Sequence, residues 1–252
     1  ENLLIGDSVK DWSERSEFSH YLNDHEIYIP QSIDQSNGLY MLYRYIVDFF
    51  PLLLPMIIML ITCNTISGEK SQGTLKFLLQ QPYSRVKVLI SKTAVCACTA
   101  LIAVIIIALA QFLLSSLIGG TGSLYYPIKV TGGQPGSFSI GNNNYITQLN
   151  YLSLCFIFII IAIVFYTCLS VFISVISPNS LTSSLLSFAV IIVPLIIQNI
   201  LPDAKGTAFI NDIHKLITGG STVFSTSILY LSISTMLLAL SAYLFKKQEV
   251  YT

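Results

Sequence analysis

The sequence predicts an all-α membrane protein, a polytopic helix bundle with five spans in this chain and one short amphipathic helix at its surface. Hydrophobic residues make up 53% of the 252 residues and charged residues only 10%, whereas soluble domains carry about 25% charged residues. The apolar residues gather in runs long enough to cross about 30 Å of hydrocarbon, which takes about 20 helical residues. The central thirds of these runs contain no Asp, Glu, Arg, Lys or His. Lipid is therefore the expected solvent for most of the chain.

The chain begins with a polar segment, residues 1–44, which we expect to lie in water and to be partly helical. It holds eight acidic residues and the only tryptophan, Trp12. We expect no signal peptide within this segment. The remaining residues, 45–252, form the predicted transmembrane domain. Its five spans are expected at about residues 46–65, 90–118, 150–176, 181–201 and 225–245.

The connections between the spans differ in kind. Residues 119–149 are rich in Gly, Asn, Ser and Pro, so we expect turns and irregular backbone outside the hydrocarbon. Residues 177–180 form a tight reversal, because Pro178 stops the preceding helix. Residues 202–224 are too short and polar to span the membrane, and they fit a re-entrant or interfacial helix pair.

The distribution of Lys and Arg predicts the orientation of the bundle. Residues 66–92 hold five of the thirteen Lys and Arg residues, whereas residues 119–149 hold one. The positive-inside rule therefore places this basic loop in the cytoplasm, together with the reversal at 177–180 and the tail at 246–252. The N-terminal segment and the two other loops then lie outside. Because an external polar segment needs something to translocate it, we expect a further span upstream of Glu1, which would give six.

The basic loop also contains an apolar stripe over residues 66–82. Leu75, Leu78, Leu79 and Pro82 fall at i, i+3, i+4 and i+7 of a helix, and Pro82 ends it because proline cannot continue the hydrogen-bond ladder. The polar flank consists of Gln72, Lys76 and Gln80. Such a helix can lie among lipid headgroups, or it can dock into a groove of a soluble partner.

One motif in this loop resembles a known family. The motif is Glu69-x-x-x-Gly73-Thr74-Leu75-x-x-Leu78-Leu79-x-x-Pro82-x-x-Arg85, followed by Ser91-Lys92 at the next span. It resembles the cytoplasmic loop of permeases of the type-2 ABC exporter family, whose coupling helix docks on a nucleotide-binding ATPase subunit. The likeness is sharp only over residues 66–92, although the six-span layout and the Lys-rich end are also similar. The absent first span and the long loop 119–149 depart from the family.

The resemblance implies that eight residues couple this chain to the ATPase. The polar contacts would be Glu69, Thr74 and Arg85. The apolar contacts would be Leu75, Leu78 and Leu79, beside Gly73, which allows close approach, and the terminating Pro82. The residues themselves also permit simpler roles, because Glu69 can favour a helix N-terminus and Gly73 can mark a kink.

The chain itself is not expected to be an enzyme or to bind a cofactor. Gly68-Glu69-Lys70-Ser71 lacks the earlier glycine that a P-loop requires, so ATP and Mg²⁺ are expected in the partner ATPase. Intramembrane enzymes and ion-coupled carriers need ionisable residues at depth, and the spans have none in their central thirds. The five cysteines lie in or beside apolar runs, as small buried hydrophobes do, and no metal site is expected.

A translocation path requires residues that bend or line the spans. Proline frees backbone carbonyls and permits kinks, so Pro51, Pro55 and Pro194 are candidate hinges. Gln111 and Gln198 can line a path or bond between helices, the second being commoner. Five or six spans leave little room for an enclosed channel. A path between two permease copies or paralogues is therefore expected, as in the family, where two permeases pair with two ATPases.

These observations predict the permease subunit of an ATP-driven ABC exporter in a plasma membrane. The uncharged interior favours an amphipathic or hydrophobic substrate. The resemblance is nearest to exporters of peptides, including bacitracin- and lantibiotic-resistance systems and exporters of toxin peptides, with drugs and lipid-linked glycans as other substrates. Frequent Ile, Asn and Ser favour a Gram-positive bacterium. The alternative is a non-transporting membrane sensor or scaffold whose external segments bind a ligand.

Overall fold

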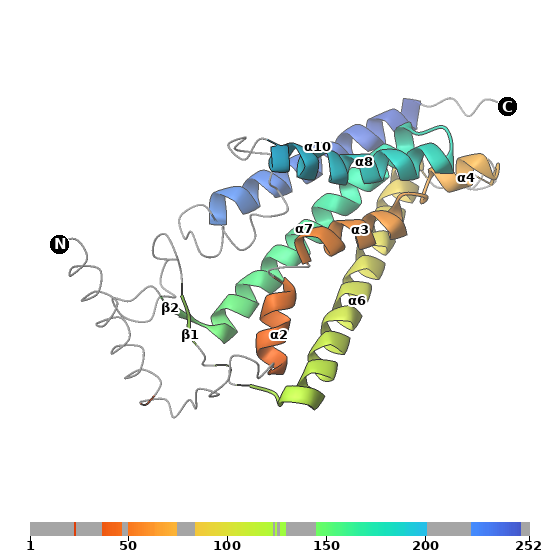
Figure 1. Ribbon diagram of the computed structural model, residues 1–252. Helices are drawn as coiled ribbons and strands as arrows, with labels where there is room; N and C mark the ends of the chain where they lie inside the picture. The colour runs from red at the N-terminus through yellow and green to blue at the C-terminus, as the bar shows by residue number, and fades with distance from the viewer. Residues whose placement is uncertain are drawn as a thin grey trace.

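Long apolar helices make up most of the described chain (Figure 1). The computed structural model describes residues 23, 37–46, 50–74, 84–122, 124, 127–129, 145–200 and 223–247. The helices are α2 (Gly38–Arg44), α3 (Phe50–Thr62), α4 (Ser67–Ser71), α6 (Arg85–Gly119), α7 (Gln148–Ile176), α8 (Ser180–Ile200) and α10 (Val223–Lys247). Two short strands are β1 (Pro127–Lys129) and β2 (Tyr145–Thr147). The predicted polytopic helical membrane bundle is confirmed, with one small strand pair added.

Among the described residues, four helical segments are long and apolar enough to cross a membrane. They are Leu52–Ser71, which joins α3 to α4, and Arg85–Gly119, Gln148–Ile176 and Ser227–Lys247. The apolar part described for α8, Ser180–Val193, is shorter. α6 begins at Arg85, five residues before the expected span, because the Ser84 hydroxyl caps it by accepting from the Lys87 N–H at 3.4 Å.

Within the first predicted span, 46–65, the structure describes α3 and the turn residues that follow it. α2 ends at Arg44, α3 runs only from Phe50 to Thr62, and the intervening residues 47–49 lie outside the described part of the chain. Pro51 is the second described residue of α3.

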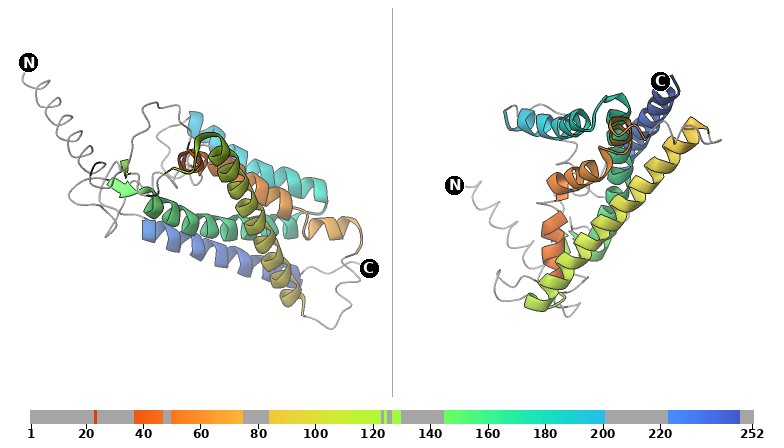
Figure 2. Two further views of the ribbon diagram at one scale, coloured as in Figure 1. Left: turned by 90° about the horizontal axis from the view of Figure 1, so that it is seen from below. Right: turned by 90° about the vertical axis from the view of Figure 1, so that its right-hand side faces the viewer.

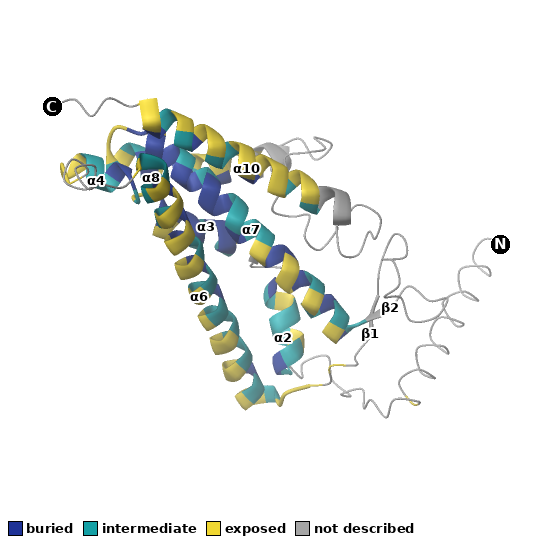
Figure 3. Ribbon diagram, turned by 180° about the vertical axis from the view of Figure 1, so that it is seen from behind, coloured by how far each residue is buried: buried dark blue, intermediate teal, exposed yellow. Residues whose placement is uncertain are grey.

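The core lies where α7 meets the other long helices. More than half of the apolar window of α7, 56%, is buried, compared with 11% for α6 and 17% for the last helix; Figure 3 shows this contrast along the helices. α7 and α10 lie side by side (Figure 2). One cluster joins α3, α6, α7 and α8, and its buried members are Leu54, Ile58, Met59, Ala100, Val104, Ile159, Ile163, Tyr166 and Ile191. α7 is therefore the central helix around which the others are arranged.

α6 and α7 converge toward the end of the bundle that carries α4 and separate toward the other end, where α2 lies between them (Figure 1). The N–H groups of Gly38 and Leu39 donate to the carbonyls of Gly120 and Thr121 at 2.8 and 3.2 Å. A Cβ on Gly38 would stand 3.0 Å from the Cβ of Ser116. A glycine is therefore needed where α2 crosses α6.

We expect Gly38→Val to lower the free energy of unfolding by about 1–3 kcal/mol, because the added atoms force α2 away from α6. Gly68→Ala is the control, since its Cβ would meet only the Cβ of Asn64, at 3.6 Å, and alanine favours a helix by about 0.5–1 kcal/mol. The measurement is the thermal unfolding midpoint of each variant in detergent. Equal midpoints for the two variants would contradict the close approach of α2 and α6.

The loop 119–149 is not wholly irregular, contrary to the prediction. β1 and β2 pair antiparallel, with Pro127 opposite Thr147 and Lys129 opposite Tyr145. The sequence Tyr145-Ile146-Thr147 consists of aromatic and β-branched residues, which favour extended backbone. Thr147 then caps α7, because its hydroxyl accepts from the Asn150 N–H at 3.4 Å. The strand pair thus leads directly into the central helix.

Candidate functional site: the α4 junction

One end of the bundle brings together helix termini that are far apart in the sequence. Buried apolar residues from four segments meet there: Ile66, Leu89, Val171, Val175 and Phe245. The described cations at this end are Lys70, Arg85, Lys87, Lys92, Lys246 and Lys247. The short helix α4 lies there beside the α7–α8 reversal (Figure 1). We call residues 63–71, residues 174–184 and Lys92 the α4 junction.

The first turn of α4 is capped by another helix. Its own N-cap residue is Ile66, which has no side-chain hydrogen bond to offer. The hydroxyl of Ser174 on α7 instead accepts from the N–H groups of Ile66 and Ser67, at 3.0 and 2.9 Å. Backbone donors at a helix start require such partners when they are buried. α7 therefore supplies the cap that the α4 sequence lacks.

The turn before α4 is also bonded to α8. The Cys63 carbonyl accepts from the hydroxyl of Ser67 at 3.1 Å and from that of Ser183 at 2.5 Å. The Asn64 side-chain oxygen accepts from the hydroxyls of Ser180 and Ser184, at 2.8 and 3.4 Å. The end of α3 and the beginning of α8 are thus held by the same few polar groups.

Lys70 connects α4 to the last turn of α7. Its ammonium group donates to the carbonyl of Val175, and to that of Ser177 at 3.5 Å. Carbonyl groups at a helix C-terminus have no partner within the helix and carry partial negative charge, so a cation stabilises them. Ser174 and Lys70 therefore attach both ends of α4 to the same turn of α7.

Glu69 forms an ion pair with Lys92 of α6. The two side chains are 29% and 20% exposed, so the pair lies at the edge of the junction rather than in bulk solvent. This ion pair gives Glu69 a partner within the chain that the sequence does not reveal. α6 is thereby the third long helix joined to α4.

The predicted helix over 66–82 is interrupted in the structure. α4 ends at Ser71, and Gly73 adopts φ +72, the left-handed conformation that ends many helices. The Gly73 N–H donates to the Lys70 carbonyl at 3.2 Å, and the Thr74 hydroxyl donates to the Glu69 carbonyl at 3.4 Å. A continuous helix through 72–74 was therefore a wrong expectation, because glycine allows the backbone to turn and these two bonds close the helix end.

The other coupling residues divide into two groups. Gly73 and Thr74 are exposed, and Arg85 is the first residue of α6 and partly exposed. Four predicted coupling residues lie outside the described residues. These are Leu75, Leu78, Leu79 and Pro82.

The predicted path and hinge residues lie on three helices, α3, α6 and α8. Pro55 is buried inside α3. The Gln111 amide donates to the Ser115 hydroxyl of its own helix at 3.5 Å, which is a bond within α6 rather than between helices. Pro194 and Gln198 belong to α8, and their side chains, like that of Pro51, are outside the described set.

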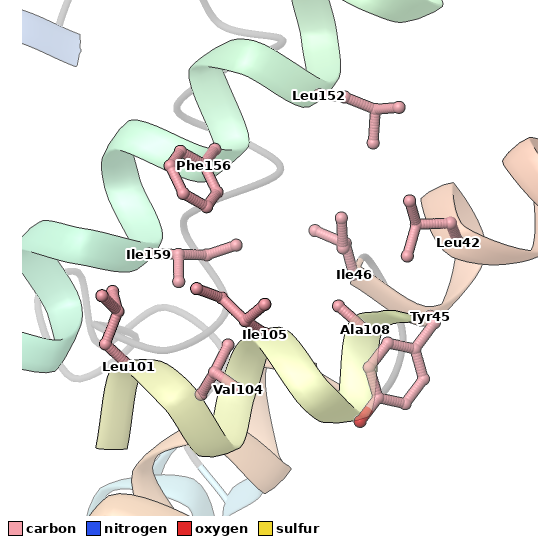
Figure 4. A pocket seen from close by; sticks show the side chains of 10 residues that line it. All are labelled: Leu42, Tyr45, Ile46, Leu101, Val104, Ile105, Ala108, Leu152, Phe156 and Ile159. Atoms are coloured by element: carbon pink, nitrogen blue, oxygen red, sulfur yellow. The ribbon is translucent and has the colours of Figure 1, made fainter. Parts of the chain in front are cut away.

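An apolar pocket of about 190 Å³ lies between α2, α6 and α7, away from the α4 junction (Figure 4). The ten lining side chains are Leu42, Tyr45, Ile46, Leu101, Val104, Ile105, Ala108, Leu152, Phe156 and Ile159. Tyr45 carries the only polar side-chain group among them. The pocket is therefore lined by apolar groups apart from one phenol. Among the described residues, no group of three or more His, Cys, Asp or Glu could hold a metal ion.

The serines of the junction were missed by sequence reasoning. They follow a helical spacing that could have indicated them, because small polar residues recur on one face of each apolar helix. In the junction they are Ser174 on α7, Ser177 just after it, and Ser180, Ser183 and Ser184 on α8. Ser170 and Ser187 continue the two series outside the junction. A polar stripe within an apolar helix commonly marks a helix contact in membranes.

Charge exchange tests whether Glu69 holds α4 to α6 through its ion pair with Lys92, a role distinct from the predicted contact with the ATPase. Glu69→Lys alone is expected to lower the thermal midpoint by a few degrees, because it places two cations side by side. The double exchange Glu69→Lys with Lys92→Glu is expected to restore the midpoint. The measurement is thermal unfolding of the two single variants and the double variant. A double variant no more stable than Glu69→Lys would show that the pair does not hold α4 to α6.

These features define a class: a multi-pass helical membrane protein in which a loop between two spans is bonded to the neighbouring helix ends. Residues 11–250 match the family model described as ABC-2 family transporter protein. The chain therefore belongs to the ABC-2 transporter family, as the motif of residues 69–85 indicates. A comparison with curated proteins gives no match. Family membership makes the chain the permease component of an ABC transporter, and it implies a partner ABC ATPase.

Proposed function

We propose that this chain moves an amphipathic or hydrophobic substrate, most simply a peptide, out of the cell, driven by a separate ABC ATPase that acts on residues 66–92. The observation that carries this proposal is the α4 junction. α4 follows directly from α3 and is bonded to α7 through Ser174 and Lys70. A force on this loop therefore acts on helix ends that belong to several spans.

The apolar stripe is the part of the loop that we assign to the ATPase groove. Leu75, Leu78 and Leu79 would enter the groove as a helix face does in other helix-in-groove contacts. Gly73 and Thr74 are exposed at the end of α4 and are available beside that face, with Pro82 and Arg85 further along the loop. Glu69 is better assigned to α6, because Lys92 already neutralises it.

The proposed transport step opens a path between two permease copies, one beside each of two ATPases. ATP binding would close the ATPase pair, displace the loop of residues 66–92 and tilt the attached helices outward. Pro55 inside α3 is a hinge in this scheme, because proline leaves a carbonyl without its helical donor. Pro51, Pro194, Gln111 and Gln198 are further candidates for hinges or for the path.

The substrate class follows from the apolar interior. The described spans bury no Asp, Glu, Lys, Arg or His, so a substrate with an exposed charge would find no partner within them. An amphipathic peptide presents an apolar face to such a surface. We place the exporter in the plasma membrane of a Gram-positive bacterium, with residues 66–92 in the cytoplasm, where the ATPase is.

Co-purification tests the proposal. The chain would be expressed with the ABC ATPase encoded beside it, extracted in mild detergent and captured through a tag on the permease. We expect a stable complex that hydrolyses ATP, because docking would remove the apolar surfaces of the stripe and of the ATPase groove from water. A captured permease without ATPase would contradict the proposal and favour a sensor or scaffold.

A further inference from the structure

We propose that Ser174 is a positioning residue for coupling: it fixes α4 to the last turn of α7, so that a displacement of α4 becomes a displacement of the central helix. The inference rests on the proposed function, because it requires a partner that moves α4. The evidence is the set of hydrogen bonds made by the buried Ser174 hydroxyl, which differ from those made by the neighbouring hydroxyl groups along α7.

The Ser174 hydroxyl has all of its hydrogen-bonding capacity occupied by the α4 segment. A serine hydroxyl offers one donor and two acceptor lone pairs. Ser174 accepts from the N–H groups of Ile66 and Ser67, at 3.0 and 2.9 Å, and donates to the Ser67 hydroxyl at 3.3 Å. The side chain is fully buried. Water therefore cannot replace these bonds when one of them is broken.

Other hydroxyls on α7 and at its C-cap behave differently. Thr167 donates to the carbonyl of Ile163 at 2.6 Å, and Ser177 donates to that of Ile173 at 2.8 Å, each one turn back along the same helix. This is the usual arrangement for serine and threonine within a helix. Ser174 instead bonds to a segment more than a hundred residues away in the sequence. Its hydroxyl serves the contact between elements and not its own helix.

α4 depends on this contact for its orientation. A helix of five residues cannot form by itself, because nucleation costs more than so few bonds return. Ser174 holds its first turn, and Lys70 holds its last turn to the carbonyls of Val175 and Ser177. With both ends attached to one turn of α7, α4 cannot pivot about that turn. Loss of the Ser174 bonds leaves Lys70 as the remaining side chain of α4 that is hydrogen-bonded to the end of α7.

The experiment measures movement at the end of the bundle that is remote from α4. Spin labels are introduced as unnatural side chains at Leu117 of α6 and Leu149 of α7, both exposed, so that the native cysteines remain. The full chain is reconstituted with its ATPase in lipid nanodiscs. Pulsed EPR then gives the distance between the labels without nucleotide and with ATP and vanadate.

We expect a nucleotide-dependent distance change in the native complex and its loss in Ser174→Ala, with ATPase binding and hydrolysis retained. Ser170→Ala is the matched control, because Ser170 lies one turn earlier on α7 and is buried, and its hydroxyl has no hydrogen-bond partner among the described residues. The control is expected to keep the native change. A native response in Ser174→Ala, or an equal loss in Ser170→Ala, would overturn the inference.

Two further readouts separate the possible failures. If Ser174→Ala yields no folded complex, Ser174→Cys is used instead, because it keeps the shape of the side chain with a weaker acceptor. Ser174→Cys is also expected to lose the distance change. A full native distance change in Ser174→Cys would overturn the inference. A native complex that binds ATPase but shows no nucleotide-dependent change would overturn the proposed function itself, and the inference with it.

Discussion

Leu78→Asp is expected to weaken binding of the ATPase by about 30-fold or more, which corresponds to about 2 kcal/mol at a buried contact. Leu78 is the central residue of the predicted apolar stripe. A carboxylate placed in an apolar groove loses its hydration without gaining a partner. The permease should still fold, because the stripe belongs to a loop between spans. The measurement is the affinity of the purified permease for the ATPase, with ATP hydrolysis measured alongside.

Gln80→Asp is the matched control for this exchange. It introduces the same charge two residues away, on the polar flank of the predicted helix. Binding is expected to stay within about twofold of the native value, because the carboxylate remains in water. Equal loss in both variants would indicate a general effect of negative charge on the basic loop. Native binding by Leu78→Asp would exclude the stripe as the docking face.

Ile163→Ala is expected to lower the free energy of unfolding by about 2–5 kcal/mol. Ile163 is 2% exposed in the cluster where α3, α6, α7 and α8 meet. Its truncation leaves a cavity, and within a membrane bundle the stabilising contribution of such a side chain is its van der Waals packing. The measurement is unfolding in mixed micelles as the fraction of denaturing detergent is raised.

Ile160→Ala, less than one turn away on the same helix, removes the same atoms from a side chain that is 39% exposed. Its expected cost is about 0.5 kcal/mol or less, because lipid can fill the space. The difference between the two variants tests which face of α7 is the core. Similar costs at both positions would contradict the central place of α7 in the bundle.

The long helices could be predicted from the sequence because apolar composition alone distinguishes a span from a loop. Each predicted span overlaps a helix, although hydropathy does not locate helix ends. α6 begins at Arg85 because of a serine cap, and a search for apolar runs passes over the polar first turn. The cap signal at Ser84 was present in the sequence and could have corrected the boundary.

The interruption at Gly73 shows where a periodic pattern misleads. Apolar spacing over 66–82 indicated one helix, and a single glycine with positive φ ends α4 at Ser71 instead. Periodicity reports which side chains share a face and says little about backbone continuity. Open space surrounds Gly73 within the described chain, and its close approach to the ATPase stays a prediction.

The α4 junction could not be predicted, because its bonds join residues distant in the sequence. Nothing near Ser174 indicates that its hydroxyl caps Ile66 and Ser67, and nothing near Glu69 indicates Lys92 as its partner. Serine is common in apolar helices and usually bonds to its own backbone. Only the folded arrangement shows which serine serves another element.

Direct contact between residues 66–92 and an ATPase is the central claim. It is tested by photocrosslinking in intact membranes, with a benzophenone side chain at position 78 and, as a control, at Thr121, which is exposed at the opposite end of α6. We expect ultraviolet light to join the ATPase to the permease from position 78 and not from position 121. Crosslinking of the ATPase from position 121 alone, or from neither position while the two proteins are present, would contradict the claim.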